Sequence, residues 1–373
     1  MIRLFKKYPK QTDAVLLVTG FILGMNLMVY FKLAGMQTQA YYTDRADFLP
    51  WLLTLISVLI GGGLVLVEYT FFERLHLYLT HWKALVVRLF TTAMIVVSGA
   101  LSVFLGRKLL LENRTLAESL MDAVAFIQTE LALSILVYMF LLSLLLNFFR
   151  QLGNHFGHGL IFNFVTGRYS QIQEEHRTFM FIDLDHSTAL AEQLGHVKYS
   201  RFLKKCFDDL SEILPRYEAD VYQYVGDEVV LTWLTSTIKP PIDLPALYFD
   251  FQKKLQAEAD IYREKFGVVP SFKAALHSGL VSITQVGNRR KALAYHGDVL
   301  NTTSRVLALA SKLRKKFLIT SLLLETVEQK PGYEVHFVDT LLLRGKQEQT
   351  EVYEVAQKNV SVDLPAARPD SLL

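Results

Sequence analysis

Long apolar runs are confined to the first 150 residues, and they restrict what this half of the chain can form. Four segments approach the length of a bilayer-crossing helix, which is about 20 residues. They cover residues 14–33, 50–67, 89–106 and 131–149. The 373-residue chain is 51% hydrophobic, and these runs carry the excess. We therefore expect residues 1–149 to form an α-helical transmembrane bundle of four spans.

Basic residues indicate how this domain would be oriented. An even number of spans places both chain ends on one side of the membrane. Lysines and arginines are enriched in cytoplasmic loops, and they occur here before the first span and between the second and third (Arg3, Lys6, Lys7, Lys10, Arg74, Lys83 and Arg88). Arg107, Lys108 and Arg114 lie in the loop that this arrangement places outside. We expect a multi-pass protein of the inner or plasma membrane with both termini in the cytoplasm.

The remaining residues have ordinary globular composition. Residues 150–177 are basic and aromatic and contain glycines, which is typical of a juxtamembrane connector. A folded domain is expected over 178–357, followed by a disordered tail over 358–373. The single cysteine, Cys206, excludes an internal disulfide and fits a reducing compartment. A net charge of +3 is too small to indicate nucleic-acid binding.

Hydrophobic periodicity predicts an α+β fold for this second domain. Strands are expected at 178–183, 219–225, 229–234, 271–285, 317–320 and 335–357, and helices at 187–214, 246–266 and 299–315. Gly195 predicts a break in the first helix, and Gly279 predicts a kink in the fourth strand. The order favours helices covering one face of a mainly antiparallel sheet.

Two carboxylates end or interrupt the predicted strands. Asp183 ends the strand 178–183, and Asp227 lies in the predicted hairpin turn Gly226-Asp227-Glu228. If the hairpin pairs beside that strand, the two side chains converge at one sheet edge. A divalent cation would relieve their repulsion, and oxygen ligands suit Mg²⁺ or Mn²⁺. Aspartate at a strand end is also a common cap or turn residue, so spacing alone leaves both interpretations open.

A second group of polar residues lies on the predicted helix 299–315. Asn301 and Arg305 are four residues apart, so they share one helix face. An amide and a guanidinium on one face can hold a sugar hydroxyl and a phosphate oxygen. The plainer interpretation is an exposed arginine beside an asparagine of the first turn.

Taken together, these stretches resemble the catalytic domain of class III nucleotidyl (adenylate/guanylate) cyclases, from Phe179 to about Val355. The matching stretches are FIDLDHST, AEQLG, YVGDEVV, LHSGLV, GDVLNTTSR and RGKQEQTEVYEV. They occur in the family's order and at similar intervals. The resemblance implies a ferredoxin-like α+β domain and says nothing specific about the first 150 residues.

The resemblance also implies a reaction and its metal ions. Asp183 and Asp227, helped by the backbone carbonyl of Leu184, would bind two Mg²⁺ or Mn²⁺ ions per site. The ribose 3′-oxygen of a nucleoside triphosphate would attack the α-phosphorus and release pyrophosphate.

Three further residues take roles from the same resemblance. Asn301 would orient the ribose, Arg305 would stabilise the transition state at the α-phosphate, and Lys346 would approach the phosphates. Sites of this family form between two head-to-tail domains. Because this chain carries both sets of residues, the resemblance implies a homodimer with two complete sites.

The residues expected to recognise the base depart from the family's usual pairs. Many adenylate cyclases have a lysine and an acid or threonine there, and guanylate cyclases tend to have Glu and Cys. This chain has Gln223 and Ala294. Glutamine both donates and accepts hydrogen bonds, so it suits several bases. We expect ATP from its frequency in the family, with GTP or a pyrimidine triphosphate left open.

Two other functions compete with a membrane-anchored dimeric cyclase. A diguanylate cyclase has a related fold, but Val225 and Val229 stand where its signature has Gly and Phe. A catalytically silent nucleotide-binding membrane receptor would be favoured by loss of a metal aspartate, the asparagine or the arginine. The chain keeps all four. Whether the membrane domain senses a stimulus or only anchors the chain stays open.

Overall fold

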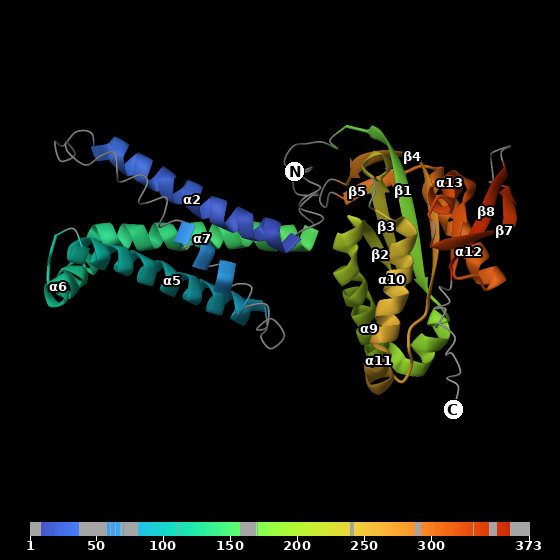
Figure 1. Ribbon diagram of the computed structural model, residues 1–373, viewed down its shortest axis with the longest axis horizontal. Coiled ribbons are helices and arrows are strands. Elements are labelled where there is room, and N and C mark those ends of the chain that lie inside the picture. The colour runs from blue at the N-terminus through green and yellow to red at the C-terminus, as the bar shows by residue number, and fades with distance from the viewer. Residues whose placement is uncertain are drawn as a thin grey trace, which may run out of the picture. The chain divides into compact units, whose positions relative to one another are not determined.

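The computed structural model describes residues 9–36, 58–59, 61–63, 65–67, 70, 81–110, 112–156, 169, 171–238, 242–287, 292–330, 332–342 and 349–358. The chain divides into two compact units, residues 2–162 and residues 163–373. Figure 1 labels the helices and strands of each unit.

Helices make up the described part of the first unit. They are α2 (Pro9–Met36), α5 (His81–Leu110), α6 (Leu116–Ile127) and α7 (Glu130–Phe156). The hydroxyl of Tyr138 on α7 donates to the Gly24 carbonyl of α2 at 2.6 Å. A Cβ added at Gly20 or Gly24 would lie 2.5 Å from a leucine methyl of α7. Glycine at these two positions therefore lets α2 and α7 pack closely.

Three of the four predicted spans fall within these helices. Residues 14–33 lie in α2, 89–106 in α5 and 131–149 in α7, whereas much of 50–67 lies outside the described residues. Across the part of the chain that the structure describes, no helix combines the length and the hydropathy needed to cross a membrane. The expected four-span bundle is therefore not supported.

The predicted loop between the third and fourth spans contains α6, a helix that the sequence analysis did not predict. Its first turn is closed by a reciprocal cap. The Thr115 amide donates to Glu118 Oε2 at 3.0 Å, and the Glu118 amide donates to Thr115 Oγ1 at 3.3 Å. This cap satisfies two backbone donors that a helix start otherwise leaves unpaired.

An eight-stranded sheet lies at the centre of the second unit. Its strands are β1 (Gln173–Leu184), β2 (Asp220–Val225), β3 (Glu228–Leu234), β4 (Phe272–Val286), β5 (Ala292–His296), β6 (Phe317–Thr320), β7 (Tyr333–Leu342) and β8 (Gln349–Gln357). The order is β2-β3-β1-β4-β6-β8-β7, and β5 pairs with β4. Among the described pairs, β4 and β6 run parallel and the rest antiparallel. The predicted α+β, mainly antiparallel fold is confirmed.

Helices cover both faces of this sheet, so the prediction that they cover one face is wrong. The helices are α9 (Ser187–Ile213), α10 (Leu244–Ala257), α11 (Ala259–Phe266), α12 (Asp298–Leu313) and α13 (Leu324–Glu328), with short 3-10 turns at Leu214–Tyr217, Thr235–Thr237 and Ser321–Leu323. Met180 and Ile182 of β1 share a core with α9, α10 and α11. Phe179 and Phe181 share the other core with α12. Both faces of β1 are therefore apolar and buried.

Several predicted boundaries differ from the observed elements. The helix expected at 246–266 is two helices, α10 and α11, that meet at Glu258. α7 continues to Phe156 and β1 begins at Gln173, so both extend into the predicted connector. Gly195 does interrupt α9, with φ 70° and ψ 161°. A kink was predicted at Gly279 in β4. The pairing of β4 with β1 continues through this residue without a shift in register.

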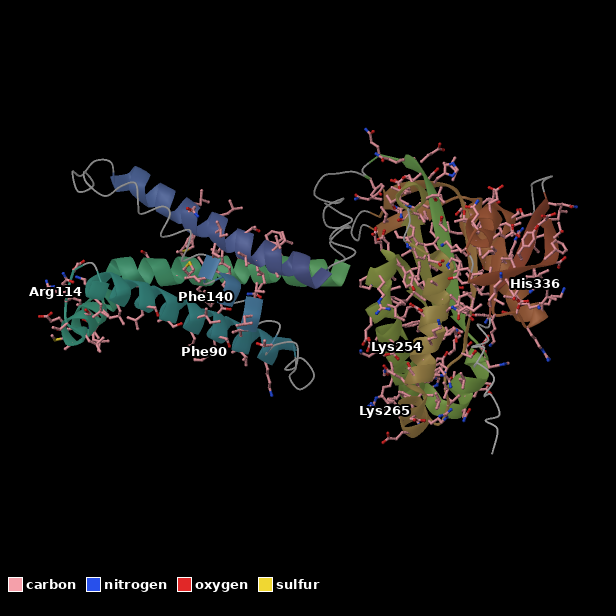
Figure 2. All side chains as sticks on the ribbon, viewed as in Figure 1. Phe90, Arg114, Phe140, Lys254, Lys265 and His336 are labelled. Atoms are coloured by element: carbon pink, nitrogen blue, oxygen red, sulfur yellow. The ribbon has the colours of Figure 1, made fainter. Side chains whose placement is uncertain are left out.

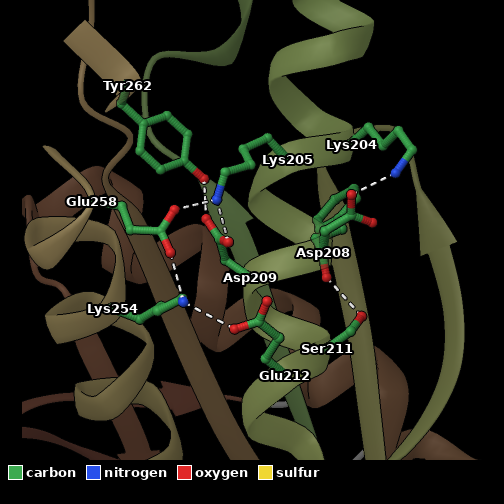
Figure 3. A network of polar contacts seen from close by, with 10 residues as sticks. Lys204, Lys205, Asp208, Asp209, Ser211, Glu212, Lys254, Glu258 and Tyr262 are labelled. Atoms are coloured by element: carbon green, nitrogen blue, oxygen red, sulfur yellow. Dashed lines mark hydrogen bonds and ion pairs between the residues drawn. The ribbon is translucent and has the colours of Figure 1, made fainter. Parts of the chain in front are cut away.

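A polar network joins α9, α10 and α11 (Figure 3). Lys205 pairs with Asp209 and Glu258. Tyr262 donates to Asp209 Oδ2 at 2.6 Å, and the Asp209 side chain is 2% exposed. Because its buried carboxylate has both a cationic and a hydroxyl partner, this network stabilises the helical layer rather than presenting a reactive group.

Candidate active site

The hairpin β2–β3 brings Asp227 to the end of β1. β3 pairs antiparallel with β1, with Glu228 opposite Asp183. Gly226 and Asp227 form the two-residue turn between Val225 and Glu228. Gly226 has φ +64°, which glycine adopts without strain. Asp227 lies close enough to Asp183 to raise the pKa of that carboxyl. The hairpin therefore pairs beside β1 as predicted, which brings the turn that carries Asp227 to the end of β1 that carries Asp183.

A buried lysine shares this end of β1. Lys273 lies opposite Asp183 on β4, is 8% exposed, and places its Nζ 2.6 Å from Asp183 Oδ2. Burial is the main cause that raises the pKa of Asp183 above its ordinary value, Lys273 opposes this shift, and Asp227 adds to it. The positive charge of Lys273 therefore favours the charged form of the Asp183 carboxylate in this half-buried site.

Glu228 adds a third carboxyl group next to the two aspartates. Burial, followed by the charges of Asp183 and Asp227, raises its pKa to about 7. The three groups interact electrostatically, yet among the described residues no set of three His, Cys, Asp or Glu side chains is arranged to hold a metal ion.

The loop that follows β1 is fixed by Asp185. Its amide donates to the Ser271 carbonyl at 2.8 Å, and Ser271 Oγ donates to Asp185 Oδ2 at 2.8 Å. Lys316 pairs with the same carboxylate. The Leu184 side chain is buried in the core at 1% exposure, so only its backbone carbonyl could coordinate a metal ion.

Asn301 and Arg305 are both exposed on α12. This helix begins after Gly297, where an added Cβ would lie 3.0 Å from the Leu280 carbonyl oxygen. Within the described residues, no hydrogen bond or ion pair joins Asn301 or Arg305 to the carboxylates of Asp183 and Asp227.

The other predicted site residues lie on strands or outside the description. Gln223 is exposed on β2, and Ala294 is partly buried on β5. Lys346 lies outside the described residues, so its predicted role is untested.

The sequence analysis missed Lys273 and did not assign Glu228. A lysine within the apolar strand FKAAL was a usable signal, because a buried charge needs a partner. The identity of that partner was not readable, since Asp183 precedes it by ninety residues.

Comparison with known proteins identifies the family of the second unit. Residues 170–356 match the model of the family described as the adenylate and guanylate cyclase catalytic domain. The curated protein "Adenylate cyclase 2" of Rhizobium meliloti (strain 1021) is 28% identical over 232 residues, which cover 62% of this chain and 64% of that protein. The similarity thus leaves about a third of that protein's own length unmatched.

Two solved structures are similar to part of this chain. The adenylyl cyclase CyaB from P. aeruginosa is 16% identical, covers 50% of this chain and 96% of its own, and has a TM-score of 0.42. A bacterial light-regulated adenylyl cyclase is 18% identical, covers 62% of this chain and 67% of its own, and has a TM-score of 0.48. Because both TM-scores are below 0.5, the family of this chain is identified by the family match and not by these two structures. Through its residues 170–356, the chain belongs to the family of adenylate and guanylate cyclase catalytic domains.

Proposed function

We propose that this protein converts ATP to 3′,5′-cyclic AMP and pyrophosphate. The ribose 3′-oxygen loses its proton and bonds to the α-phosphorus, and the bond from that phosphorus to the pyrophosphate oxygen breaks. The observation that carries the proposal is the approach of Asp227 to Asp183 in a domain of this family. Asn301 and Arg305, on the exposed face of α12, supply the second half of the site.

The residues at the end of β1 fit a divalent cation. Asp183 and Asp227 offer carboxylate oxygens, and the carbonyl of Leu184 offers a third, which are the ligands that Mg²⁺ and Mn²⁺ prefer. Mg²⁺ usually keeps open positions for substrate phosphates, so two aspartates suffice. Burial, with a smaller contribution from Asp227, raises the pKa of Asp183, and a bound cation would favour the charged form of both carboxylates. When bound, such ions would lower the cost of the charge that develops on the phosphates.

The chain's own side chains bind and orient the nucleotide. Lys273 holds the Asp183 carboxylate in one position through its 2.6 Å contact. Asn301 accepts or donates to the ribose hydroxyls, and Arg305 binds oxygens of the α-phosphate as their charge grows. Lys346 would add a cation near the departing pyrophosphate.

We propose a homodimer as the active form. Asp183 and Asp227 make no hydrogen bond or ion pair with Asn301 or Arg305 in the described residues of one chain. A head-to-tail pair of identical chains would bring each half-site to its complement and would form two complete sites. Mixing an Asp227→Ala chain with an Arg305→Ala chain tests this. One intact site per heterodimer should recover activity that neither variant has alone.

Choice of base is the least constrained part of the proposal. ATP is supported by the name of the curated relative, "Adenylate cyclase 2". Gln223 is exposed, and its amide can pair with several bases. The activity assay therefore compares the cyclisation of GTP, CTP and UTP with that of ATP.

We also propose that the first unit anchors the chain in a membrane, with both termini cytoplasmic. Large apolar side chains are exposed on its helices, including Phe90 on α5 at 67% and Phe140 on α7 at 44% (Figure 2). On α6 the buried residues are the small Ser119 and Ala123, whereas Leu116 and Met121 are 59% and 67% exposed. This pattern is the reverse of a water-facing helix.

Membrane anchoring is checked by fractionation. The protein should stay with membranes after a high-salt and alkaline carbonate wash and dissolve only in detergent. Recovery in the carbonate supernatant would contradict the proposal.

Enzymatic activity is tested with the purified full-length protein. ATP, GTP, CTP and UTP are incubated separately with Mg²⁺ or Mn²⁺, and cyclic nucleotides are quantified by mass spectrometry. Asp227→Ala should lower kcat by about 100-fold or more, the size expected when several kcal/mol of charge stabilisation are lost. Asp208→Ala, at an exposed carboxylate paired with Lys204 on α9, is the matched control. The proposal fails if no triphosphate is cyclised, or if both variants match the wild type.

A further inference from the structure

A buried arginine lies at the opposite end of β1 from Asp183. Arg177 is 6% exposed, and its Nε donates to Glu175 Oε2 at 2.9 Å. Its Nη2 donates to the Tyr169 hydroxyl at 3.5 Å, and that hydroxyl donates to Glu175 Oε1 at 3.2 Å. Nη1 has no hydrogen-bond partner among the described residues. A buried guanidinium with an unused donor lowers the stability of the folded state. Packing alone therefore does not explain why an arginine occupies this position.

The arginine lies against the ring of Tyr295 on β5. Its guanidinium carbon is 5.0 Å from the centre of that ring, within the range of a cation–π interaction. The same ring meets Phe179 of β1 at 5.5 Å and Tyr222 of β2 at 4.7 Å, both edge to face. Tyr295 therefore joins three strands that are not all neighbours in the sheet, since β5 pairs only with β4 and β2 only with β3 in the described residues.

Each strand in this contact carries a residue of the candidate site. Tyr222 directly precedes Gln223, and Tyr295 directly follows Ala294. β1 ends in Asp183. The contact between the two tyrosines therefore fixes the spacing between the residues expected to recognise the base.

A β-bulge makes Gln223 depend on this contact. Val221 pairs with Leu231 and Gln223 pairs with Val230, so Tyr222 is the extra residue between two consecutive partners. Bulges change the direction in which the following side chain points. Since Tyr222 has no partner across the ladder, its packing against Tyr295 is what holds the bulge, and with it the direction of the Gln223 amide.

We propose that Tyr222 and Tyr295, supported by Arg177, are positioning residues that set nucleotide selectivity. They need not touch the substrate. They hold Gln223 and Ala294 at one separation, and a change in that separation alters how well one base is accepted relative to another. The proposal rests on the cyclase function proposed above.

The test compares variants that keep or remove the aromatic contact. In the full-length protein, Tyr295→Phe keeps the ring and should leave the ratio of kcat/KM for ATP to that for GTP within about twofold of the wild type. Tyr295→Leu removes the edge-to-face and cation–π contacts and should change this ratio by about fivefold or more, the size expected for an aromatic pair. Tyr222→Leu and Arg177→Met should change it in the same direction.

A matched control separates positioning from general destabilisation. Tyr248 lies in the core with α9, α10 and α11 and donates to the Phe272 carbonyl at 2.9 Å; at 2% exposure it is more deeply buried than the partly buried Tyr295. Tyr248→Leu should lower the melting temperature without changing the selectivity ratio. Equal changes in ratio from Tyr248→Leu and Tyr295→Leu would overturn the proposal, as would an unchanged ratio in Tyr295→Leu and Tyr222→Leu.

Failure of the underlying function would be recognised separately. If the wild type cyclises no triphosphate, the same ratio is read from competition of ATP and GTP against a fluorescent nucleotide. The variants should then shift the ratio of dissociation constants in the same pattern. If Tyr295→Leu does not fold, Tyr222→Leu and Arg177→Met carry the test, and an unchanged ratio in both would refute the proposal.

Discussion

Replacing Glu228 with glutamine should stabilise the metal-free protein at alkaline pH and have little effect at acidic pH. Glu228 lies opposite Asp183 in the β1–β3 pair. Burial, then Asp183 and Asp227, raises its pKa from 4.5 to about 7. The charged form of Glu228 is therefore unfavourable in the folded state, and an amide of the same shape removes that charge.

The sign and size follow from proton linkage. Because the folded-state pKa is raised, the folded protein binds more protons than the unfolded chain between pH 4.5 and 7, so stability falls as pH rises through this interval. The shift corresponds to at most about 3.4 kcal/mol. Glu228 is only partly buried and solvent screens the charges, so we expect Glu228→Gln to gain about 1–2 kcal/mol at pH 8.

Urea and thermal unfolding of the full-length protein in EDTA measure this effect. At pH 8 the melting temperature of the variant should rise by about 2–4 °C for each kcal/mol. At pH 5 Glu228 is largely protonated, so the gain should nearly vanish. Glu192→Gln, an exposed position on α9, is the control. An equal gain at both pH values, or none at pH 8, would refute the reasoning.

Three further substitutions test the packing around the site. Gly279→Ala would place a Cβ 2.6 Å from Cγ2 of the stiff, β-branched Val299 on α12, so it should cost about 1–3 kcal/mol. Adding Val299→Ala should recover part of that loss in urea unfolding, and strictly additive losses would contradict the contact. Lys273→Met should destabilise the metal-free protein by about 2–3 kcal/mol at pH 8 and by less at pH 5, because it leaves the partly buried Asp183 carboxylate without its cation. A loss independent of pH would argue against that pairing. Asp209→Ala should cost about 3 kcal/mol, against less than about 1 kcal/mol for the exposed Asp208→Ala on the same helix. Equal losses in calorimetry would mean that burial of the network is not what stabilises it.

The elements that sequence predicted well are those set by local chemistry. The hairpin around Gly226-Asp227 was readable because a glycine-containing turn separates two β-rich runs. The break at Gly195 was readable because glycine adopts a conformation that side chains rarely take. The shared helix face of Asn301 and Arg305 follows from their spacing alone.

Predictions that depended on partners elsewhere in the chain were less successful. The continuous apolar run of β1 did not reveal that α12 covers the second face of the sheet. The break at Glu258 and the helix α6 were also not predicted, because no glycine or proline marks the first and the second was taken as a loop between two spans. The prediction of a membrane domain rested on hydropathy alone. Among the described residues, no helix has both the length and the hydropathy that a membrane span requires.

By itself, the sequence determined the fold class of the second unit, the turn that carries Asp227 and the family of its catalytic domain. Only the tertiary structure decided which charges meet. Strand pairing places Lys273 beside Asp183 and Glu228 opposite it, and it places Arg177 and Tyr295 in one buried cluster. The physical reason is range. Periodicity and turn chemistry act over a few residues, whereas the pKa values and positions of these side chains depend on groups about 45 to 120 residues away, brought close by long-range pairing.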